Sequence, residues 1–308
     1  MLDAPRCLIV GSDGMTGSAL LARLRREGIH ALGTSRRTPQ TTDTIPLDLA
    51  SDPRSWRIPA ATSVVVNCAA VAGAAVCQRS PDESRRVNVD AVVALAQRCA
   101  SESRMFVQLS SDRVFSGRSP RTRADAPFAP ASEYGRQKAE ADRRLLEMFA
   151  EGGELAIVRF AKLVSRTHAL FGAWRDSLCR GEAIRPFADM TMAPVTLDFA
   201  IAVLYKVILE RRTGVFQASA ESDVTYSQFA GDLAEACGAA RELVIPISSV
   251  SATVDIDPPP PFTSLDVSRV RNEMNLIPPT PKEVAEWIVR RLSPERRNAV
   301  SLQRKATH

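Results

Sequence analysis

The chain lacks several features that mark common classes of protein. Its six cysteines form no CxxC pair and match no zinc-binding spacing, so they predict reduced, mostly buried side chains. No apolar run approaches the length needed to cross a bilayer. The first residues, MLDAPRCLIVGSDG, lack the charged-then-apolar pattern of a secretory signal. We therefore expect a cytoplasmic globular protein without membrane contact.

Lysine is also scarce, because only five of the forty basic residues are Lys and all the others are Arg. The net charge is +5, but the basic residues are scattered along the chain. A scattered excess of Arg favours compositional bias, with binding of an anionic nucleotide as the functional alternative. No nucleic-acid-binding motif accompanies the charge, so no nucleic acid is expected as a partner.

Short apolar segments alternate with helical patterns over the first 160 residues. Strands are predicted at 7–10, 30–34, 63–70, 105–109 and 155–160, and helices at 18–27, 81–100 and 132–149. This alternation predicts an α/β fold of the Rossmann type, with a doubly wound parallel sheet. Ligands of such sheets bind beyond the carboxyl ends of the strands. Those ends are predicted at Gly11, Thr34, Asn67, Ser110 and Phe160.

Three glycines follow the first predicted strand, in GSDGMTG at residues 11–17. Glycine permits a tight turn and lets the backbone approach a pyrophosphate. The helix that follows presents free N–H groups and its positive dipole end to that anion. The spacing therefore predicts a dinucleotide site, with a simple strand-to-helix turn as the alternative. The expected cofactor contacts here are Gly11, Asp13, Gly14, Met15, Thr16 and Gly17.

The second predicted strand has no acidic residue at its end, where an NAD-binding chain would hold the ribose 2′-hydroxyl. It ends in Ser35, Arg36 and Arg37, and guanidinium groups suit a 2′-phosphate. These residues favour NADP(H) over NAD(H), with a solvated Arg pair as the alternative. Asp48 and Leu49, after the next strand, are placed to flank the adenine.

Tyr134 and Lys138 form a YxxxK in a chain that has three tyrosines. Residues four apart share one face of a helix, so the phenol and the ammonium are expected in one pocket. Free tyrosine has a pKa of about 10, and a nearby Lys cation is expected to lower it. Ser110 and Ser111 end a strand, where a hydroxyl can bind a substrate carbonyl. The structural alternatives are a half-buried helix aromatic and a turn serine.

Together these motifs resemble the extended short-chain dehydrogenase/reductases, and within them the dTDP-4-dehydrorhamnose reductase branch. The matching segments are 11–17, 65–73, 77–91, 108–117, 134–138, 156–160, 192–200, 214–220 and 264–270. The resemblance implies an NADPH-dependent oxidoreductase that reduces a keto group, on a nucleotide-linked 4-keto-6-deoxysugar. A homodimer is one assembly compatible with it.

The resemblance also implies a role for each matching residue. Gly11, Gly14 and Gly17 would hold the pyrophosphate, and Asn88 would brace the site. Tyr134 would be the general acid, Lys138 would bind the nicotinamide ribose, and Ser111 would orient the carbonyl. Further cofactor contacts would be Cys68, Ala69, Ala70, Ser110 and Phe160. The substrate contacts would be Val71, Ser111, Arg113 and Lys162.

The chain departs from this family at the substrate end. The family often carries Tyr at the position of Arg113, and a Ser/Thr–Trp–aromatic stretch where this chain has residues 160–164. The resemblance therefore does not fix the sugar. Glutamates linked to magnesium-mediated dimerisation in some relatives have no match, and Ala19 stands in the first helix. No metal is expected.

The domain plan predicts an NADP-binding Rossmann domain at 1–160, which also receives parts of 190–220. A smaller C-terminal α/β lobe at 161–292 would close over the sugar, and residues 293–308 would form a flexible basic tail. Strand-like pieces are predicted at 183–187 and 214–219. Two rival functions stay open. One is an epimerase or dehydratase that recycles NAD, against which Arg113 after Asp112 argues. The other is a non-catalytic NADP-binding regulatory subunit or sensor, since the β subunit of methionine adenosyltransferase resembles the same branch.

Overall fold

The computed structural model of the chain describes residues 6–37, 43–251 and 260–290. Its centre is a seven-stranded sheet of order β10-β6-β5-β4-β1-β2-β3, with every neighbouring pair parallel. The strands are β1 (Cys7–Val10), β2 (Ala31–Ser35), β3 (Thr44–Pro46), β4 (Val64–Asn67), β5 (Met105–Ser111), β6 (Leu155–Phe160) and β10 (Gly214–Ala218). The order runs outward in both directions from the β1–β4 pair. The predicted Rossmann-type α/β fold is therefore confirmed.

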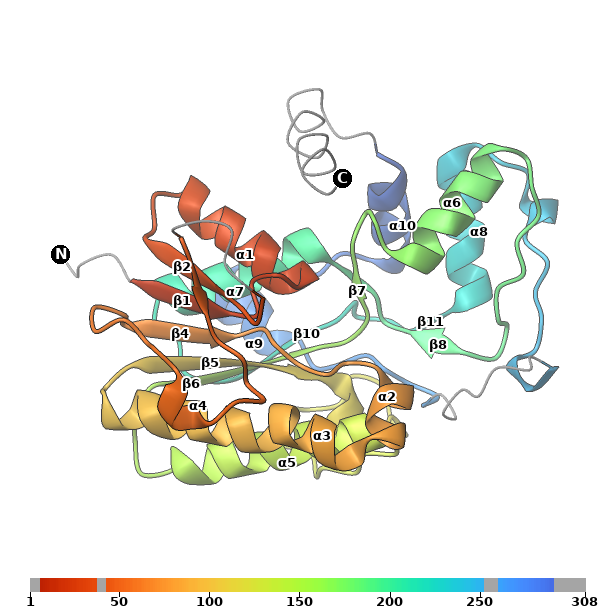
Figure 1. Ribbon diagram of the computed structural model, residues 1–308. Coiled ribbons are helices and arrows are strands. Elements are labelled where there is room, and N and C mark those ends of the chain that lie inside the picture. The colour runs from red at the N-terminus through yellow and green to blue at the C-terminus, as the bar shows by residue number, and fades with distance from the viewer. Residues whose placement is uncertain (1–5, 38–42, 252–259, 291–308) are drawn as a thin grey trace.

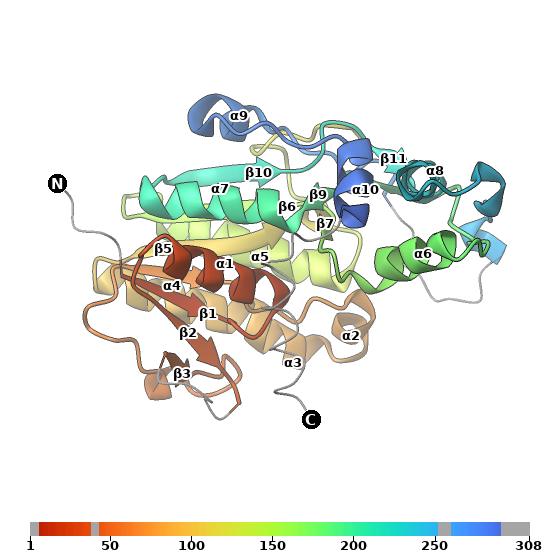
Figure 2. The same cartoon turned by 90° about the horizontal axis from the view of Figure 1, so that it is seen from above.

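Helices cover both faces of this sheet (Figures 1 and 2). One face carries α1 (Met15–Arg26), α7 (Leu197–Leu209) and α9 (Ser268–Met274), and the other carries α4 (Ala91–Ser101) and α5 (Glu133–Met148). Alternate residues of β1 face opposite layers, with Cys7 and Ile9 on the α1 side and Leu8 and Val10 on the α4 side. Strands buried on both faces are apolar throughout, which explains the short unbroken apolar runs of the sequence.

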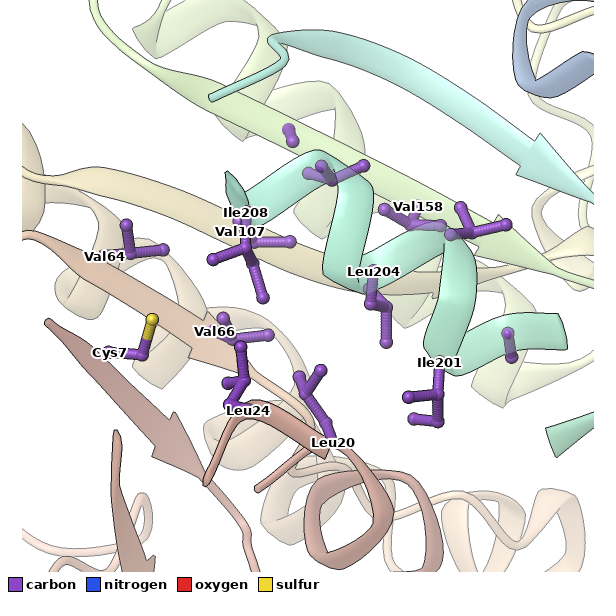
Figure 3. Close-up of a cluster of buried hydrophobic side chains, with 14 of the residues drawn as sticks. Cys7, Leu20, Leu24, Val64, Val66, Val107, Val158, Ile201, Leu204 and Ile208 are labelled. Atoms are coloured by element: carbon purple, nitrogen blue, oxygen red, sulfur yellow. The ribbon is translucent and has the colours of Figure 1, made fainter. Parts of the chain in front are cut away.

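The core under α1 and α7 fixes the start of the phosphate loop (Figure 3). Leu20 and Leu24 of α1 and Leu204 and Ile208 of α7 pack against the strands and are fully buried. Each such side chain contributes roughly 1.5–3 kcal/mol relative to exposure. Helix α1 is thereby held against the sheet, with its first residue, Met15, at the carboxyl end of β1.

The helix predicted at 81–100 is interrupted in the structure. It divides into α3 (Pro81–Arg85), a π-helical turn at Arg86–Asp90 and α4, after a further short helix, α2 (Ala74–Arg79). A π turn inserts an extra residue into the ladder and often lies at a functional site. Here it carries Asn88, which is fully buried.

A separate core lies beyond one end of the sheet, where α6 (Ala169–Cys179), α8 (Tyr226–Cys237) and α10 (Pro281–Val289) pack together (Figure 1). Two short ladders connect it to the rest, β8 (Thr191–Met192) with β11 (Val224–Thr225), and β7 (Leu163–Val164) with β9 (Val195–Thr196). The predictions missed α8, although Thr225 and Gln228 form a capping box at its start.

The strand predicted at 183–187 is wrong. Ile184 and Phe187 make isolated bridges to Val244 and Ile247, without a continuous ladder. Pro186 lies between them and has no N–H to donate, which prevents regular pairing. The predicted tail at 293–308 lies outside the described residues.

Within the described ranges, none of the helices combines the length and apolarity that a membrane span requires. In the same ranges, no cluster of three or more His, Cys, Asp or Glu side chains is arranged to hold a metal ion.

Candidate active site

A cleft of about 710 Å³ lies at the carboxyl ends of β4, β5 and β6, beside the start of α1. Many of the predicted site residues line it together, namely Met15, Thr16, Cys68, Ala69, Ala70, Ser110, Ser111, Arg113, Tyr134, Lys138, Phe160 and Lys162. Met190, Met192, Tyr226 and Thr263 line it from the C-terminal half of the chain, and the predictions missed these four. The cleft is therefore bounded by the sheet on one side and by C-terminal elements on the other.

The glycine loop between β1 and α1 has the close packing that the sequence pattern requires. Gly11 adopts a left-handed φ of 79°, and a Cβ on it would collide with Ala69. A Cβ on Gly17 would meet the carbonyl oxygen of Gly11. Gly14 caps α1 without any side-chain hydrogen bond, so no side chain of the loop blocks the first-turn N–H groups. The residues present fit a bound pyrophosphate.

The loop also supplies an acidic side chain to the end of β2. Ser35 Oγ donates a 2.5 Å hydrogen bond to Asp13 Oδ2 and accepts one from the Arg37 backbone at 3.0 Å. No acidic residue directly follows β2 in the sequence. The fold nevertheless brings the Asp13 carboxylate to the end of β2 from the neighbouring loop. Arg36 and Arg37 are both exposed.

Other predicted cofactor residues lie away from the cleft. Leu49 is buried in the core on the α4 side, and Asp48 accepts a hydrogen bond from the Ala50 backbone at 2.9 Å. Neither is among the residues that line the cleft. The lining also omits Gly11, Asp13, Gly14, Gly17, Ser35, Arg36, Arg37, Val71 and Asn88.

Asn88 does not line the cleft but hydrogen-bonds to the loop that follows β4. Its side chain accepts from the Val71 N–H at 2.9 Å and donates to the Val71 carbonyl at 3.0 Å. It also donates to Gln137 Oε1 at 2.8 Å. Gln137, which the predictions missed, is buried inside the YxxxK itself. This network ties the π turn to both the β4 loop and α5.

Ser111, Tyr134 and Lys138 converge on the cleft from β5 and α5. Ser132 caps α5 by accepting from the Gly135 N–H at 3.2 Å. A Cβ on Gly135 would collide with the carbonyl of Arg113, so this glycine lets the helix approach the end of β5. Gly135 directly follows Tyr134 in the sequence. The predictions did not use this position, although a glycine there allows the close approach of α5.

Lys138 and Ser111 are both hydrogen-bonded within the protein. Lys138 Nζ donates to the Leu109 carbonyl at 2.7 Å and is buried. Ser111 Oγ donates to Asp112 Oδ1 at 2.8 Å and accepts from the Arg113 N–H at 3.2 Å. The hydroxyl of Ser111 is thus oriented by its two neighbours in the chain.

The pKa of Tyr134 is raised rather than lowered. Burial is the largest cause, the Asp112 carboxylate adds to it, and Ser111 and Arg113 oppose it. Burial also lowers the pKa of Lys138 to about 8, against the opposing effect of Asp142. The expectation that Lys138 brings the pKa of Tyr134 below its usual value is not met, because burial outweighs the opposing effects of Ser111 and Arg113. A protonated phenol at neutral pH suits proton donation.

A buried ion pair lies beneath this set. Arg159 Nε donates to Asp142 Oδ2 at 2.9 Å, with neither side chain exposed. Ser110 Oγ donates to the same oxygen at 3.0 Å. The Arg159 guanidinium lies over the rings of Phe115 and Phe128, 5.1 Å from each centroid. Asp142 lies one turn after Lys138, and a charged Arg159 in an otherwise apolar strand is the signal that could have identified the pair.

Comparisons with known proteins find one matching family and relatives that include reductases and a subunit of another enzyme, methionine adenosyltransferase 2 subunit beta. The family model of the RmlD substrate binding domain matches residues 5–293. The probable low-salt glycan biosynthesis reductase Agl14 of Haloferax volcanii is 28% identical over 285 residues, 88% of this chain and 93% of that protein. Methionine adenosyltransferase 2 subunit beta of Bos taurus is 30% identical over 143 residues, 46% of this chain and 43% of that protein.

A solved structure shows the same fold. The dTDP-4-dehydrorhamnose reductase from Bacillus anthracis in complex with NADP aligns with a TM-score of 0.76 and 19% identity. The alignment covers 94% of this chain and 98% of that one.

Replacement of Arg159 by Met should destabilise the protein strongly. It leaves the Asp142 carboxylate buried without its partner, which typically costs about 3–5 kcal/mol. The free energy of unfolding in urea measures the loss. The double variant Arg159→Met with Asp142→Leu removes both charges and should recover at least half of it. A single variant as stable as the parent would contradict this account of the ion pair.

Proposed function

The chain belongs to the RmlD substrate binding domain family, and from that family and the cleft geometry we propose that it is an NADPH-dependent reductase of a keto group on a nucleotide-linked sugar. A 4-keto-6-deoxysugar is the first substrate to test, because the B. anthracis structure is named for a reductase of such a sugar. A cytoplasmic location and a homodimer stay predictions.

One observation carries the proposal. Ser111, Tyr134 and Lys138 line the same cleft as Met15 and Thr16 at the start of the phosphate-loop helix. A carbonyl beside a dinucleotide would therefore meet a proton donor and a hydroxyl in one enclosed space. Binding of a nucleotide alone needs no such convergence.

NADPH, when bound, supplies a hydride to the keto carbon. Tyr134 donates its proton to the carbonyl oxygen as negative charge develops there. Ser111 stabilises the same oxygen with its hydroxyl, after exchanging its hydrogen bond to Asp112 for one to the substrate. After it donates its proton, Tyr134 is a phenolate, which the Lys138 ammonium stabilises. Tyr134 then regains a proton from solvent. The keto group gains one hydride and one proton and becomes a secondary alcohol.

A regulatory subunit is the second candidate, and the match to methionine adenosyltransferase 2 subunit beta favours it. That match covers 46% of this chain, whereas the match to the Agl14 reductase covers 88%. The wider match supports catalysis. An epimerase or dehydratase is disfavoured because Asp112 is followed by Arg113 instead of a second acid.

Substitution of Tyr134 by Phe should lower kcat by roughly 10²–10⁴-fold, since the developing alkoxide loses its proton donor. NADPH affinity should be almost unchanged. Oxidation of NADPH in the presence of dTDP-4-keto-6-deoxyglucose measures the effect. Tyr205→Phe is the matched control, because Tyr205 lies under Arg23 on α1, away from the cleft. Equal activity of Tyr134→Phe and the parent would refute Tyr134 as the acid.

The alkaline limit of the reaction should be set by Lys138. Its pKa of about 8 means that it is charged below pH 8 and loses its proton as the pH rises further. Because kcat/KM reports groups of the free enzyme, kcat/KM for NADPH should fall through this range. Lys138→Arg keeps the charge and should move the decline to higher pH. A profile that stays flat above pH 8 in the parent would argue against this role.

Asp13 should weaken the preference for NADPH over NADH. Its carboxylate, held by Ser35, lies where a ribose 2′-phosphate would approach. Asp13→Asn removes a like charge worth about 1 kcal/mol, so NADPH should bind several-fold tighter relative to NADH. Fluorescence titration of both cofactors measures the ratio, and Arg36→Ala should move it in the opposite direction. An unchanged ratio in Asp13→Asn would exclude the effect.

A further inference from the structure

Two cationic side chains lie side by side at the substrate end of the cleft. Ser111 of β5 is paired with Phe160 of β6 in the parallel register. Arg113 follows the first of these by two residues and Lys162 follows the second by two, and both line the cleft. The paired strands end at Ser111 and Phe160, so the two residues follow neighbouring strand ends, and the charge of Arg113 lowers the pKa of Lys162.

Neither cation is held in a close ion pair, although the Asp112 carboxylate interacts electrostatically with both Arg113 and Lys162. Within the described ranges, neither the Arg113 nor the Lys162 side chain forms an ion pair within 4.0 Å. Asp112 is the single acidic residue among the described residues that line the cleft, and it accepts the Ser111 hydroxyl. The same lining contains four basic residues, Arg79, Arg113, Lys138 and Lys162. The cleft carries an excess of positive charge.

This arrangement is costly without a ligand. Both side chains are half-buried, and Lys162 lies over the ring of Phe171 with its Nζ 5.8 Å from the centroid. Burial and the charge of Arg113 both lower the pKa of Lys162. His168, which stacks on Phe171, is kept neutral near pH 7, since burial and Lys162 lower its pKa to about 4. An anion between Arg113 and Lys162 would relieve the repulsion.

The position of the pair indicates where the anion lies on the substrate. The backbone N–H of Arg113 donates to Ser111 Oγ, the hydroxyl assigned to the carbonyl, so the Arg113 side chain starts next to that hydroxyl and lines the same cleft. In a pyranose with a keto group at C4, a diphosphate on C1 lies across the ring. A carboxylate at C6 is attached to C5, the carbon next to the carbonyl. A cationic pair beside Ser111 therefore fits the carboxylate better than the diphosphate.

We propose that Arg113 and Lys162 bind a carboxylate carried by the carbon next to the keto carbon, so that the preferred substrate is a nucleotide-linked keto-uronic acid. The inference rests on the proposed reduction of nucleotide-linked keto sugars. It changes one part of that proposal, placing a carboxylate where a 6-deoxysugar has a methyl group. The reduction itself is unchanged, with one hydride and one proton added to the carbonyl.

The Arg113–Lys162 pair can be tested with nucleotide sugars that carry a C4 hydroxyl, the alcohols that the reverse reaction would oxidise, because these compounds are stable. Calorimetric titration of the NADP⁺-loaded protein compares UDP-glucuronic acid with UDP-glucose, and UDP-galacturonic acid with UDP-galactose. These two pairs cover both orientations of the C4 hydroxyl. In one pair the acid should bind at least about tenfold tighter than the neutral sugar, the usual scale of hydrogen bonds to a charged group. Lys162→Met and Arg113→Met should each abolish most of that preference, measured as the ratio of the two affinities.

Arg79→Met is the matched control, because it removes a cation from the same cleft but from α2. It should leave the preference for the acid unchanged. Equal affinity of the parent for acid and neutral sugar would overturn the proposal. So would a Lys162→Met variant that binds both sugars equally less well, because the pair would then hold the diphosphate.

A parallel assay separates this proposal from the proposed function. If neither UDP-uronic acid binds while dTDP-4-keto-6-deoxyglucose is reduced with NADPH, the carboxylate site is wrong and the reductase stands. If no nucleotide sugar binds and none is reduced, both fail.

Discussion

The buried ion pair between Asp142 and Arg159 joins the three elements that carry the candidate chemistry. Asp142 lies on α5 with Tyr134 and Lys138, and Arg159 lies on β6, three residues before Lys162. Ser110 of β5 donates to the same carboxylate, one residue before Ser111. Since the pair is costly to break, these elements keep one relative position. The proposed proton donor, the proposed carbonyl-binding hydroxyl and the proposed substrate cations all lie on or directly after these elements.

Burial has opposite consequences for the two ionisable groups of the YxxxK. It raises the pKa of Tyr134 and lowers that of Lys138 to about 8. A phenol that keeps its proton beside an ammonium that is still charged is the state required of an acid catalyst at neutral pH. Asp142 limits the loss of charge on Lys138, so the ion pair also contributes to the electrostatics of the site.

The sequence patterns predicted the parts of the fold that depend on local rules. Buried parallel strands are apolar throughout, and Gly11, Gly14 and Gly17 mark the phosphate loop, so the sheet and its first crossover could be read directly. The approach of Asp13 to Ser35 depends on the packing of two loops that are distant in sequence. Helix α8 was missed although its capping box is local. The raised pKa of Tyr134 depends on burial, which no spacing of residues reveals.

The central claim is that this cleft transfers hydride to a carbonyl instead of merely binding a nucleotide. Incubation of the protein with dTDP-4-keto-6-deoxyglucose and NADPH that carries deuterium at both positions of nicotinamide C4 tests it most directly, with the sugar product analysed by mass spectrometry. The account predicts one deuterium on the former keto carbon for each NADPH consumed. A protein that binds NADPH but transfers no deuterium to this sugar or to a keto-uronic acid counterpart would contradict it.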